Sequence, residues 1–233
     1  QQKGLLEIFQ TAEKFEHAHD TLKQAHALGL TDTKLLSKEE LNKAEPNLTI
    51  DAQGALYFGC DAHCSPNQLT EALLLQLRDA GVQFISNAAV NGFIIKGKRV
   101  TGVKYDQGSL EADEVVVATG SWSRGVLSEL DISIPMMPGR GYSITVNDFV
   151  HGFNYPAILV EGRVAVTPFT STSIRFGGTM EITSHQTPPR LNRVQGIVNA
   201  VKRYYPDLAL SVPPLEKVWY GYRPCSADGL PYI

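Results

Sequence analysis

VVVATGSWSRG, residues 115–125, is the stretch of sequence that decides the fold. Three consecutive valines are typical of a strand that is buried on both faces, and Ala118, Thr119 and Gly120 follow them with side chains that leave the backbone nearly bare. A buried strand that ends in a small-residue turn brings the main chain of an α/β domain close to a ligand. The pattern is equally compatible with a central strand followed by an ordinary turn.

The residues before this stretch predict its structural setting. Ser65-Pro66 is a typical helix start, with the serine as cap and the proline in the first turn. The helix carries an apolar stripe at helical spacing: Leu69, Leu73, Leu77 and Ala80. Residues 82–85 then read as a short strand, and residues 88–113 alternate between apolar and polar with regular glycines, which predicts an antiparallel meander of three strands. We therefore expect an α/β layer with a meander over residues 64–130.

The rest of the chain predicts a mixed part with long antiparallel strands. The elements expected there are a strand at 3–10, a helix begun by Thr11, a helix opened by a Ser37–Glu40 capping box, strands at 55–58, 143–146 and across 157–182, a helix at 191–205 and a strand at 217–222. The expected fold class is therefore α/β (α+β): a partial α/β layer with a β-meander, interleaved with a mixed, largely antiparallel sheet.

Composition excludes several classes of protein. The chain has 233 residues, of which 43% are hydrophobic and 19% charged, as in an ordinary globular protein. A net charge of −3 without a dense Lys/Arg run gives no field that would attract nucleic acid. Three cysteines do not form a disulfide framework, so we expect a reducing compartment, the cytoplasm. There is no run of eighteen apolar residues and no signal peptide, and both ends are abrupt, so we expect a fragment of a longer polypeptide.

Arg223 is the charged residue with the clearest chemical potential. It follows the aromatic stretch WYGY, residues 219–222, and precedes Pro224. A planar guanidinium among aromatic rings can bind a carboxylate through two parallel hydrogen bonds. The same pattern also fits a structural arginine that stacks on a tyrosine or bonds loop carbonyls. Arg140 and Tyr142, in GRGY, either line a pocket or face solvent.

Other motifs are absent or weak. Cys60 and Cys64 flank Asp61 and His63 in CDAHC, but no second Cys/His pair follows at ligand spacing, so we expect two free thiols and no metal site. The sequence has no G-x-G-x-x-G after an N-terminal strand, no phosphate-binding G-x-x-x-x-G-K-[ST], no G-x-S-x-G and no H-E-x-x-H. Hydrolases of those types, zincins and a complete nucleotide site are thereby excluded.

Six segments in a fixed order carry a resemblance to a known family. They are QQKGLLEIFQTAEKF (1–15), GALYFGCDAHCSPNQLTEALLLQLRDAGVQF (54–84), VVVATGSWS (115–123), GRGYSIT (139–145), RFGGTMEI (175–182) and GYRPCSADGLPYI (221–233). Together they resemble the FAD-dependent amine and amino-acid oxidoreductases of the D-amino-acid oxidase type, in particular the bacterial D-amino-acid dehydrogenase small subunits and, next, glycine oxidase. The resemblance covers essentially the whole chain, and the last segment resembles the G-x-R-P…D-G-x-P signature near the family's C-terminus.

The resemblance implies site residues position by position. Arg223 matches the arginine of that signature, which in the family binds the substrate carboxylate, so the functional interpretation of Arg223 is favoured over the structural one. Tyr142 and Met180 match secondary pocket positions. Positions implied to lie against FAD are Val90, through its backbone at the adenine, and Ala118, Thr119, Gly120 and Trp122, in the turn after the valines.

The resemblance also implies an activity and a division of the chain. The activity is oxidative deamination of a D-amino acid, with hydride transfer from Cα to FAD and an electron acceptor that is either a quinone or oxygen. Residues 1–63 and 131–222 would form the substrate domain, 64–130 a partial FAD-binding domain, and 223–233 the start of a C-terminal FAD segment. The family's N-terminal dinucleotide fingerprint and its glycine-rich C-terminal stretch are absent, so we expect this fragment alone to bind FAD weakly and to be inactive.

Two alternatives stay open. A relative in the same family that oxidises glycine, sarcosine or a 2-hydroxy acid would use the same arginine, because a guanidinium binds any small carboxylate. A non-catalytic domain that binds a carboxylate or a partner protein is the alternative of another class. A peripheral contact with the inner membrane face is compatible with the cytoplasmic location that the cysteines suggest.

Overall fold

A computed structural model describes residues 1–149 and 152–232. The chain divides into two compact units, each assembled from segments that are distant in the sequence. Unit 1 comprises residues 1–69, 141–180 and 188–220, and unit 2 comprises residues 70–140, 181–187 and 221–233. The fold class expected from the sequence is confirmed. The finer division at residues 63, 130 and 222 into substrate and cofactor parts stays a prediction.

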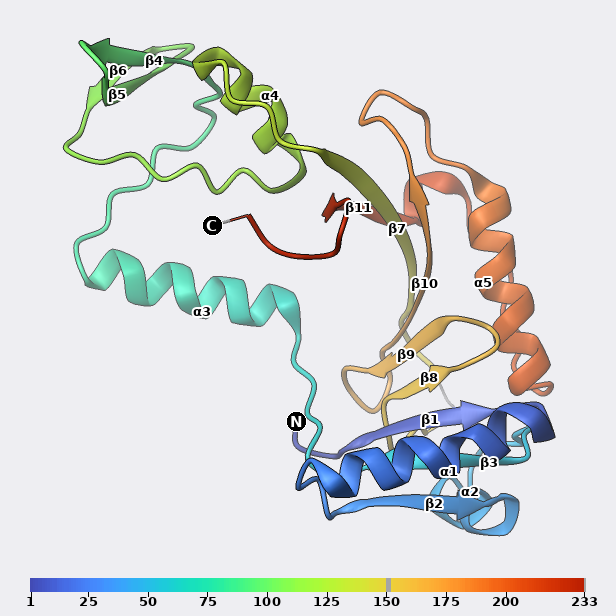
Figure 1. The fold of residues 1–233 in the computed structure, drawn as a ribbon. Coiled ribbons are helices and arrows are strands. Elements are labelled where there is room, and N and C mark those ends of the chain that lie inside the picture. Colours follow the sequence, from blue (N-terminus) through green and yellow to red (C-terminus); the bar gives the residue numbers. More distant parts are fainter. Residues whose placement is uncertain (150–151, 233) are drawn as a thin grey trace. The chain divides into compact units, whose positions relative to one another are not determined.

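The N-terminal part of unit 1 is a small layered structure of strands and helices (Figure 1). Its elements are β1 (Leu5–Phe9), α1 (Ala12–Ala27), β2 (Thr33–Ser37), α2 (Lys38–Ala44) and β3 (Gly54–Phe58). Both helix starts expected from the sequence are confirmed. Thr11 accepts a hydrogen bond from the backbone N–H of Lys14, and Ser37 and Glu40 form a reciprocal capping box.

The main sheet is mixed. The further strands are β7 (Met136–Val146), β8 (Ala157–Leu159), β9 (Val164–Pro168), β10 (Ile174–Ile182) and β11 (Trp219–Ser226). The strand order is β11-β7-β10-β9-β8-β1-β3-β2. Strand β1 pairs in parallel with β8, whereas β1 with β3, β2 with β3, β8 with β9 and β9 with β10 are antiparallel. A mixed, largely antiparallel sheet was expected from the strand-rich segments outside residues 64–130, and that expectation is confirmed.

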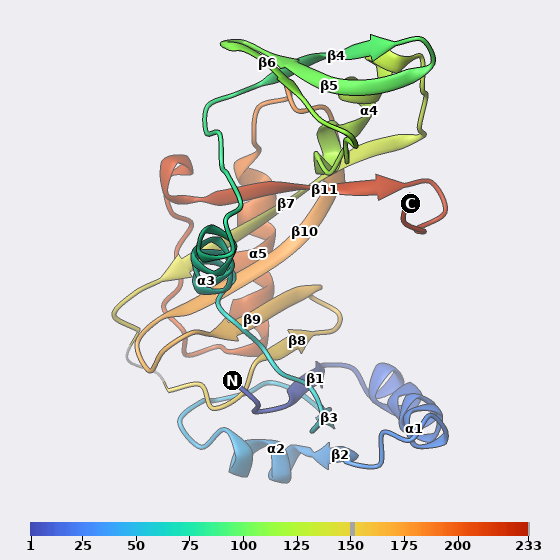
Figure 2. The same cartoon turned by 90° about the vertical axis from the view of Figure 1, so that its left-hand side faces the viewer.

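The core of unit 1 lies between this sheet and helix α5 (Leu191–Tyr204), which contacts β8 and β9 (Figure 2). The helix carries the amphipathic stripe that the sequence predicted, and the buried members are Val194, Ile197, Val198, Ala200, Val201 and Tyr204. They pack with the inward-facing residues of the strands in one continuous apolar cluster. Burial of this stripe holds the helix on the sheet, because the removal of apolar side chains from water lowers the free energy of the folded state.

Unit 2 contains most of α3 (Pro66–Asp79) and a separate three-stranded sheet. The expected meander is confirmed as β4 (Val90–Lys96), β5 (Arg99–Tyr105) and β6 (Gly108–Glu111), paired antiparallel in sequence order. Short helical turns follow: a 3-10 turn at Gly120–Trp122, α4 (Ser123–Leu127) and a second 3-10 turn at Ser128–Leu130. Helix α4 contacts β4, as both ribbon views show (Figures 1 and 2).

Two strands expected in unit 2 are not formed. Residues 82–85 and 115–117 are irregular, and Val116 is 87% exposed, so the prediction of a strand buried on both faces is wrong. The stripe on α3 is likewise open, since Leu73 and Leu77 are 48% and 42% exposed. A strand persists only where a neighbouring strand satisfies its backbone N–H and C=O groups, and no strand of residues 1–149 or 152–232 pairs with either segment.

Among the described residues, no helix is both apolar enough and long enough to cross a bilayer.

Candidate functional site

The small-residue turn at residues 118–122 exposes its backbone. Gly120 has a φ of 57°, in the left-handed region that glycine enters without strain, and no atom lies within 4 Å of the position that a Cβ would take. The hydroxyl groups of Thr119 and Ser123 lie 3.0 Å apart, which ties the turn to the start of α4. Ala118 and Thr119 are exposed. A bare, open backbone at this point suits the approach of a planar ligand.

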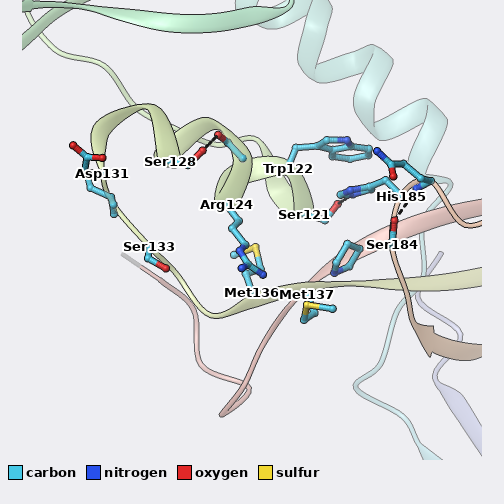
Figure 3. A pocket seen from close by; sticks show the side chains of 14 residues that line it. Ser121, Trp122, Arg124, Ser128, Asp131, Ser133, Met136, Met137, Ser184 and His185 are labelled. Carbon is cyan, nitrogen blue, oxygen red and sulfur yellow. Dashed lines mark hydrogen bonds between the residues drawn. The ribbon is translucent and has the colours of Figure 1, made fainter.

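The turn is anchored on His185. Ser121, which is only 4% exposed, places its Oγ 2.9 Å from Nε2 of the His185 ring. The indole of Trp122 stacks on the same imidazole with ring centroids 4.3 Å apart and planes inclined by 14°. Figure 3 shows both contacts at one edge of a pocket. Two consecutive residues of the turn are therefore held by one side chain from the loop after β10.

Strand β11 reaches the same cluster through Tyr222. The Tyr222 ring meets His185 and Trp122 edge-on, at centroid distances of 4.7 and 5.8 Å. Its hydroxyl donates a hydrogen bond to the backbone carbonyl of His185 at 3.3 Å. Arg223 is the next residue along β11. The cluster of Ser121, Trp122, His185 and Tyr222 therefore connects the small-residue turn to the position of the candidate carboxylate-binding arginine.

Arg140 lies beneath the cluster and is fully buried. Its Nε and Nη2 donate to Oε1 of Glu181 at 2.9 and 2.6 Å, and its Nη1 donates to the carbonyl of Thr187 at 2.5 Å. The guanidinium carbon lies 5.9 Å from the centroid of the Tyr222 ring. Of the two environments left open by the sequence for Arg140, solvent is excluded. Arg140 therefore bonds to Glu181 near the end of β10 and to Thr187, on either side of His185 in the sequence.

A pocket of about 720 Å³ opens beside the cluster (Figure 3). It is lined by Ser121, Trp122, Arg124, Gly125, Ser128, Asp131, Ile132, Ser133, Met136, Met137, Pro138, Ser184, His185 and Gln186. A neighbouring pocket of about 540 Å³ shares Arg124, Met136 and Met137 and adds Cys225 and Ser226. The lining of the larger pocket is mixed, with serine, charged and amide side chains beside Trp122, Ile132 and the two methionines.

Arg223 differs from Arg140 in both exposure and pairing. The Arg223 side chain is exposed, and no carboxylate of the described residues forms an ion pair with it. A guanidinium without an internal acid keeps its donor fork available for an external carboxylate. The guanidinium donors of Arg140, by contrast, are already bonded to Glu181 and to a backbone carbonyl.

The remaining candidates are placed as follows. Val90, the first residue of β4 in unit 2, is 39% exposed. Tyr142 on β7 is 2% exposed, and its hydroxyl accepts a hydrogen bond from the Arg190 backbone N–H at 3.0 Å. Met180 at the end of β10 in unit 1 is 50% exposed. The structure thus brings Ala118–Gly120 and Trp122 together with the neighbour of Arg223, while Tyr142 and Met180 belong to unit 1.

His185 and Glu181 were not predicted as site residues. His185 stands in the loop sequence TSHQTPP, where no local spacing marks it, and its partner Ser121 lies 64 positions away. The only signal for Glu181 was the polar alternation in RFGGTMEI, which indicated the face of the strand but not an ion pair.

The expectation about CDAHC concerns unit 1. Cys60 and Cys64 are free and exposed, and the described residues contain no cluster of three or more His, Cys, Asp or Glu side chains that could hold a metal ion. Desolvation, and then the negative charges of Asp32 and Asp61, raise the pKa of the Cys60 thiol. A raised pKa lowers the thiolate fraction at neutral pH.

Solved structures with the same fold include a glycine oxidase and an L-proline dehydrogenase. The glycine oxidase of Geobacillus kaustophilus superposes with a TM-score of 0.88 at 22% identity, covering 100% of this chain and 61% of that one. At this identity the likeness shows the fold. The fold therefore belongs to the class shared by these solved structures, and the roles of Arg223 and of the turn at residues 118–122 stay predictions.

The family follows from the sequence match. The family model described as DAO, FAD dependent oxidoreductase, matches residues 1–233, and the chain belongs to this family. It is 28% identical to a D-amino acid dehydrogenase of Granulibacter bethesdensis and 30% identical to one of Neisseria gonorrhoeae, covering 100% and 99% of this chain. The chain spans 56% and 55% of those relatives. The resemblance seen in the sequence is confirmed.

The residues present fit part of an FAD site. The open space at Gly120, the exposed turn before it and the exposed Val90 leave the backbone positions expected against FAD accessible. The indole of Trp122 is 53% exposed and offers a planar apolar surface at the same turn. These observations agree with a cofactor-side surface, and they show no phosphate-binding loop among the described residues.

Proposed function

We propose that this chain is the substrate-binding part and a portion of the cofactor-binding part of a flavin-dependent enzyme that deaminates a D-amino acid oxidatively. The observation that carries the proposal is the exposed guanidinium of Arg223, which has no acid partner among the described residues and follows Tyr222 of the turn-anchoring cluster. Support also comes from the family match over the whole chain and from relatives named D-amino acid dehydrogenase.

Each proposed role follows from the chemistry of the side chain. Arg223 would bind the substrate carboxylate through two parallel N–H···O bonds, which fix the Cα–H direction as well as the position. Tyr142 and Met180 would line the substrate side. Backbone atoms of Val90 and of Ala118–Gly120, with the Trp122 ring, would contact the cofactor. FAD, when bound, supplies the acceptor for the hydride that leaves Cα.

The proton balance needs no dedicated side-chain base. An amino acid that binds with a neutral amine releases hydride from Cα and leaves as the imino acid, which water then hydrolyses. The substrate amine must therefore lose its proton before or during binding.

We propose cytoplasmic catalysis with a quinone or oxygen as the final electron acceptor, and peripheral contact with the inner membrane face in the quinone case.

A second candidate is oxidation of glycine, sarcosine or another small carboxylate. The observation that favours it is the likeness of the fold to glycine oxidase at a TM-score of 0.88. A substrate panel under anaerobic conditions, read as flavin bleaching, separates the two candidates. Bleaching by D-amino acids with larger side chains supports the first, and bleaching by glycine or sarcosine alone supports the second.

The proposal is tested with Arg223→Ala and Arg223→Lys in the full-length gene product. We expect Arg223→Ala to raise KM about a hundredfold, because two charge-assisted hydrogen bonds are lost. Arg223→Lys should raise KM by about tenfold, since lysine keeps the charge but loses the fork. The matched control is Arg203→Ala, which removes an exposed arginine from the last turn of α5. An unchanged KM in Arg223→Ala would overturn the carboxylate-binding role, and a protein that binds carboxylates but never reduces flavin would favour a non-catalytic binding domain.

A further inference from the structure

His185 joins three segments of unit 2 that are distant in the sequence. Its ring contacts Ser121 through a hydrogen bond of 2.9 Å and stacks on Trp122 at 4.3 Å. Its backbone carbonyl accepts the hydroxyl of Tyr222, and its ring meets the Tyr222 ring at 4.7 Å. The side chain and the backbone of one residue therefore bind the cofactor-side turn and the strand of Arg223 at the same time.

The loop that carries His185 has little freedom of its own. Arg140 binds Glu181 near the end of β10, just before the loop, and the carbonyl of Thr187 within the loop. The backbone N–H of Thr183 donates to the carbonyl of Pro138 at 3.1 Å. Since the guanidinium of Arg140 is completely buried, water does not compete for these bonds. Movement of His185 relative to β7 is thereby opposed at three points.

We infer that His185 is a positioning residue that sets the register between the cofactor-side turn and Arg223. The inference rests on the proposed function, because the spacing between the turn and Arg223 matters only if one contacts the cofactor and the other binds the substrate. Tyr222 directly precedes Arg223, so a shift of Tyr222 moves the arginine backbone, while a shift of Ser121 and Trp122 moves the turn. Displacements of about 1 Å at such positions cost about a hundredfold in rate when the reacting atoms must be aligned.

A nucleophilic role for the Ser121–His185 pair is not supported. Ser121 lies at the edge of the pocket but is only 4% exposed, which leaves little of it accessible to a substrate carbonyl. No carboxylate among residues 1–149 and 152–232 is hydrogen-bonded to the His185 ring, so the third member that orients such a pair is not found there. The contacts of His185 are those of a spacer between two segments.

The first test reads the contact itself and needs no cofactor. The chain has two tryptophans, so Trp219→Phe leaves Trp122 as the only indole. In that background, His185→Ala should shift the emission to the red and increase quenching by acrylamide, because one face of the indole becomes uncovered. His185→Phe keeps an aromatic ring against Trp122 and should show a smaller shift. His19→Ala, on the exposed surface of α1, is the matched control and should change neither quantity.

The second test is a double-mutant cycle with Arg223 in the full-length gene product. We expect His185→Ala to lower kcat/KM for the amino acid by about tenfold to a hundredfold. In an Arg223→Ala background the same change should have a clearly smaller effect on KM, since residues that act through one another are not additive. A merely structural role would lower activity by the same factor in both backgrounds. His185→Phe should retain part of the activity and supplies the cycle if His185→Ala fails to fold.

The outcomes separate the two proposals. Additive effects of the His185 and Arg223 substitutions on KM, or an unchanged Trp122 emission in His185→Ala, would overturn the positioning role. The proposed function would still stand in that case if Arg223→Ala raises KM. A normal Arg223→Ala overturns the proposed function, and the positioning role falls with it, even where the fluorescence change is present.

Discussion

The guanidinium of Arg140 and the carboxylate of Glu181 form an ion pair that water does not reach, with Nη2 and Oε1 2.6 Å apart and side-chain exposures of 0% and 5%. Both charges have been transferred out of water, and each is compensated chiefly by the other. Removal of one partner leaves an unpaired buried charge. The resulting loss of folding free energy is larger than the net stabilisation that the intact pair provides.

We therefore expect Arg140→Met or Glu181→Leu to lower the free energy of unfolding by about 3–5 kcal/mol. The double variant Arg140→Met, Glu181→Leu should be less destabilised than either single variant, because no charge remains unpaired. Urea denaturation measures all three. Lys23→Ala is the control, since the Lys23–Asp20 pair is exposed and contributes about 0.5 kcal/mol or less. A double variant that is as unstable as the sum of the singles would contradict this account.

The burial of Glu45 should make the protein less stable as the pH rises. Its carboxylate is buried and accepts the backbone N–H groups of Asn154 and Tyr155 at 2.8–3.1 Å, and desolvation raises its pKa to about 7. Between its ordinary value of 4.5 and pH 7 the folded state binds more protons than the unfolded state, so stability falls as the pH rises through this window. We expect a loss of about 1–3 kcal/mol between pH 4.5 and 8, measured by urea denaturation.

Glu45→Gln should remove most of that pH dependence, because the amide oxygen still accepts a hydrogen bond but does not ionise. Glu39→Gln, on the exposed side of helix α2, which Glu45 directly follows, is the control and should retain the full slope. A slope that survives Glu45→Gln would show that another group is responsible.

Glu161 predicts the opposite dependence at lower pH. Burial alone would raise the pKa of Glu161, but the hydroxyl of Tyr204 and the N–H groups of Gln10 and Thr11 stabilise the carboxylate more strongly and lower its pKa to about 2. This contribution is complete above pH 4.5 and is lost as the pH falls toward 2.

Because solvent screens this partly exposed carboxylate, we expect Glu161→Gln to lower the free energy of unfolding by about 1 kcal/mol at pH 7 and to leave a smaller decrease on acidification. Tyr204→Phe removes one hydroxyl donor and keeps the buried ring, so its effect should be smaller. The comparison is made by urea denaturation at pH 7 and pH 3. Equal stabilities of wild type and Glu161→Gln at pH 7 would rule the network out as a stabilising feature.

Gly102 predicts a local defect in the meander. A Cβ at this position of β5 would lie 2.2 Å from the carbonyl oxygen of Leu110 and 2.9 Å from Cα of Glu111, both backbone atoms of β6. Gly102→Ala should therefore force β6 away and cost about 1–3 kcal/mol. Gly125→Ala is the control, because nothing lies within 4 Å of its Cβ position in α4, and it should be neutral or stabilise by up to about 1 kcal/mol. Faster amide exchange in β5 and β6 of Gly102→Ala, and not of Gly125→Ala, checks the assignment.

Local elements were predictable because their signals are carried by neighbouring residues. Thr11 caps α1, and Ser37 with Glu40 caps α2, using backbone groups within three positions. Residues 82–85 and 115–117 were not predictable in the same way. A strand exists only with a partner, and the sequence pattern reports the side chains of a segment but not the presence of a neighbour.

The site divides along the same line. Arg223 was predictable because the surrounding signature, GYRP…DGLP, is local in sequence. His185 was not, since its meaning depends on Ser121 and Tyr222, 64 and 37 positions away. Arg140 was partly predictable. The sequence left open whether its side chain lines a pocket or faces solvent, and only the contact with Glu181 showed that it is a buried structural arginine rather than a ligand-binding cation.

The parallel pairing of β1 with β8 constrains the order of events during synthesis. Leu6 pairs with Ala157, so the N-terminal strand has no parallel partner until roughly 150 further residues have been made. At about 5–20 residues per second this is a wait of roughly 8–30 s. The antiparallel partners β3 and β2 emerge much earlier, so the hairpin-like layer of β1, β2 and β3 can form on the ribosome and present an open edge to which β8 is later added. The nascent chain therefore carries an unpaired strand edge during that interval, and an exposed strand edge favours aggregation.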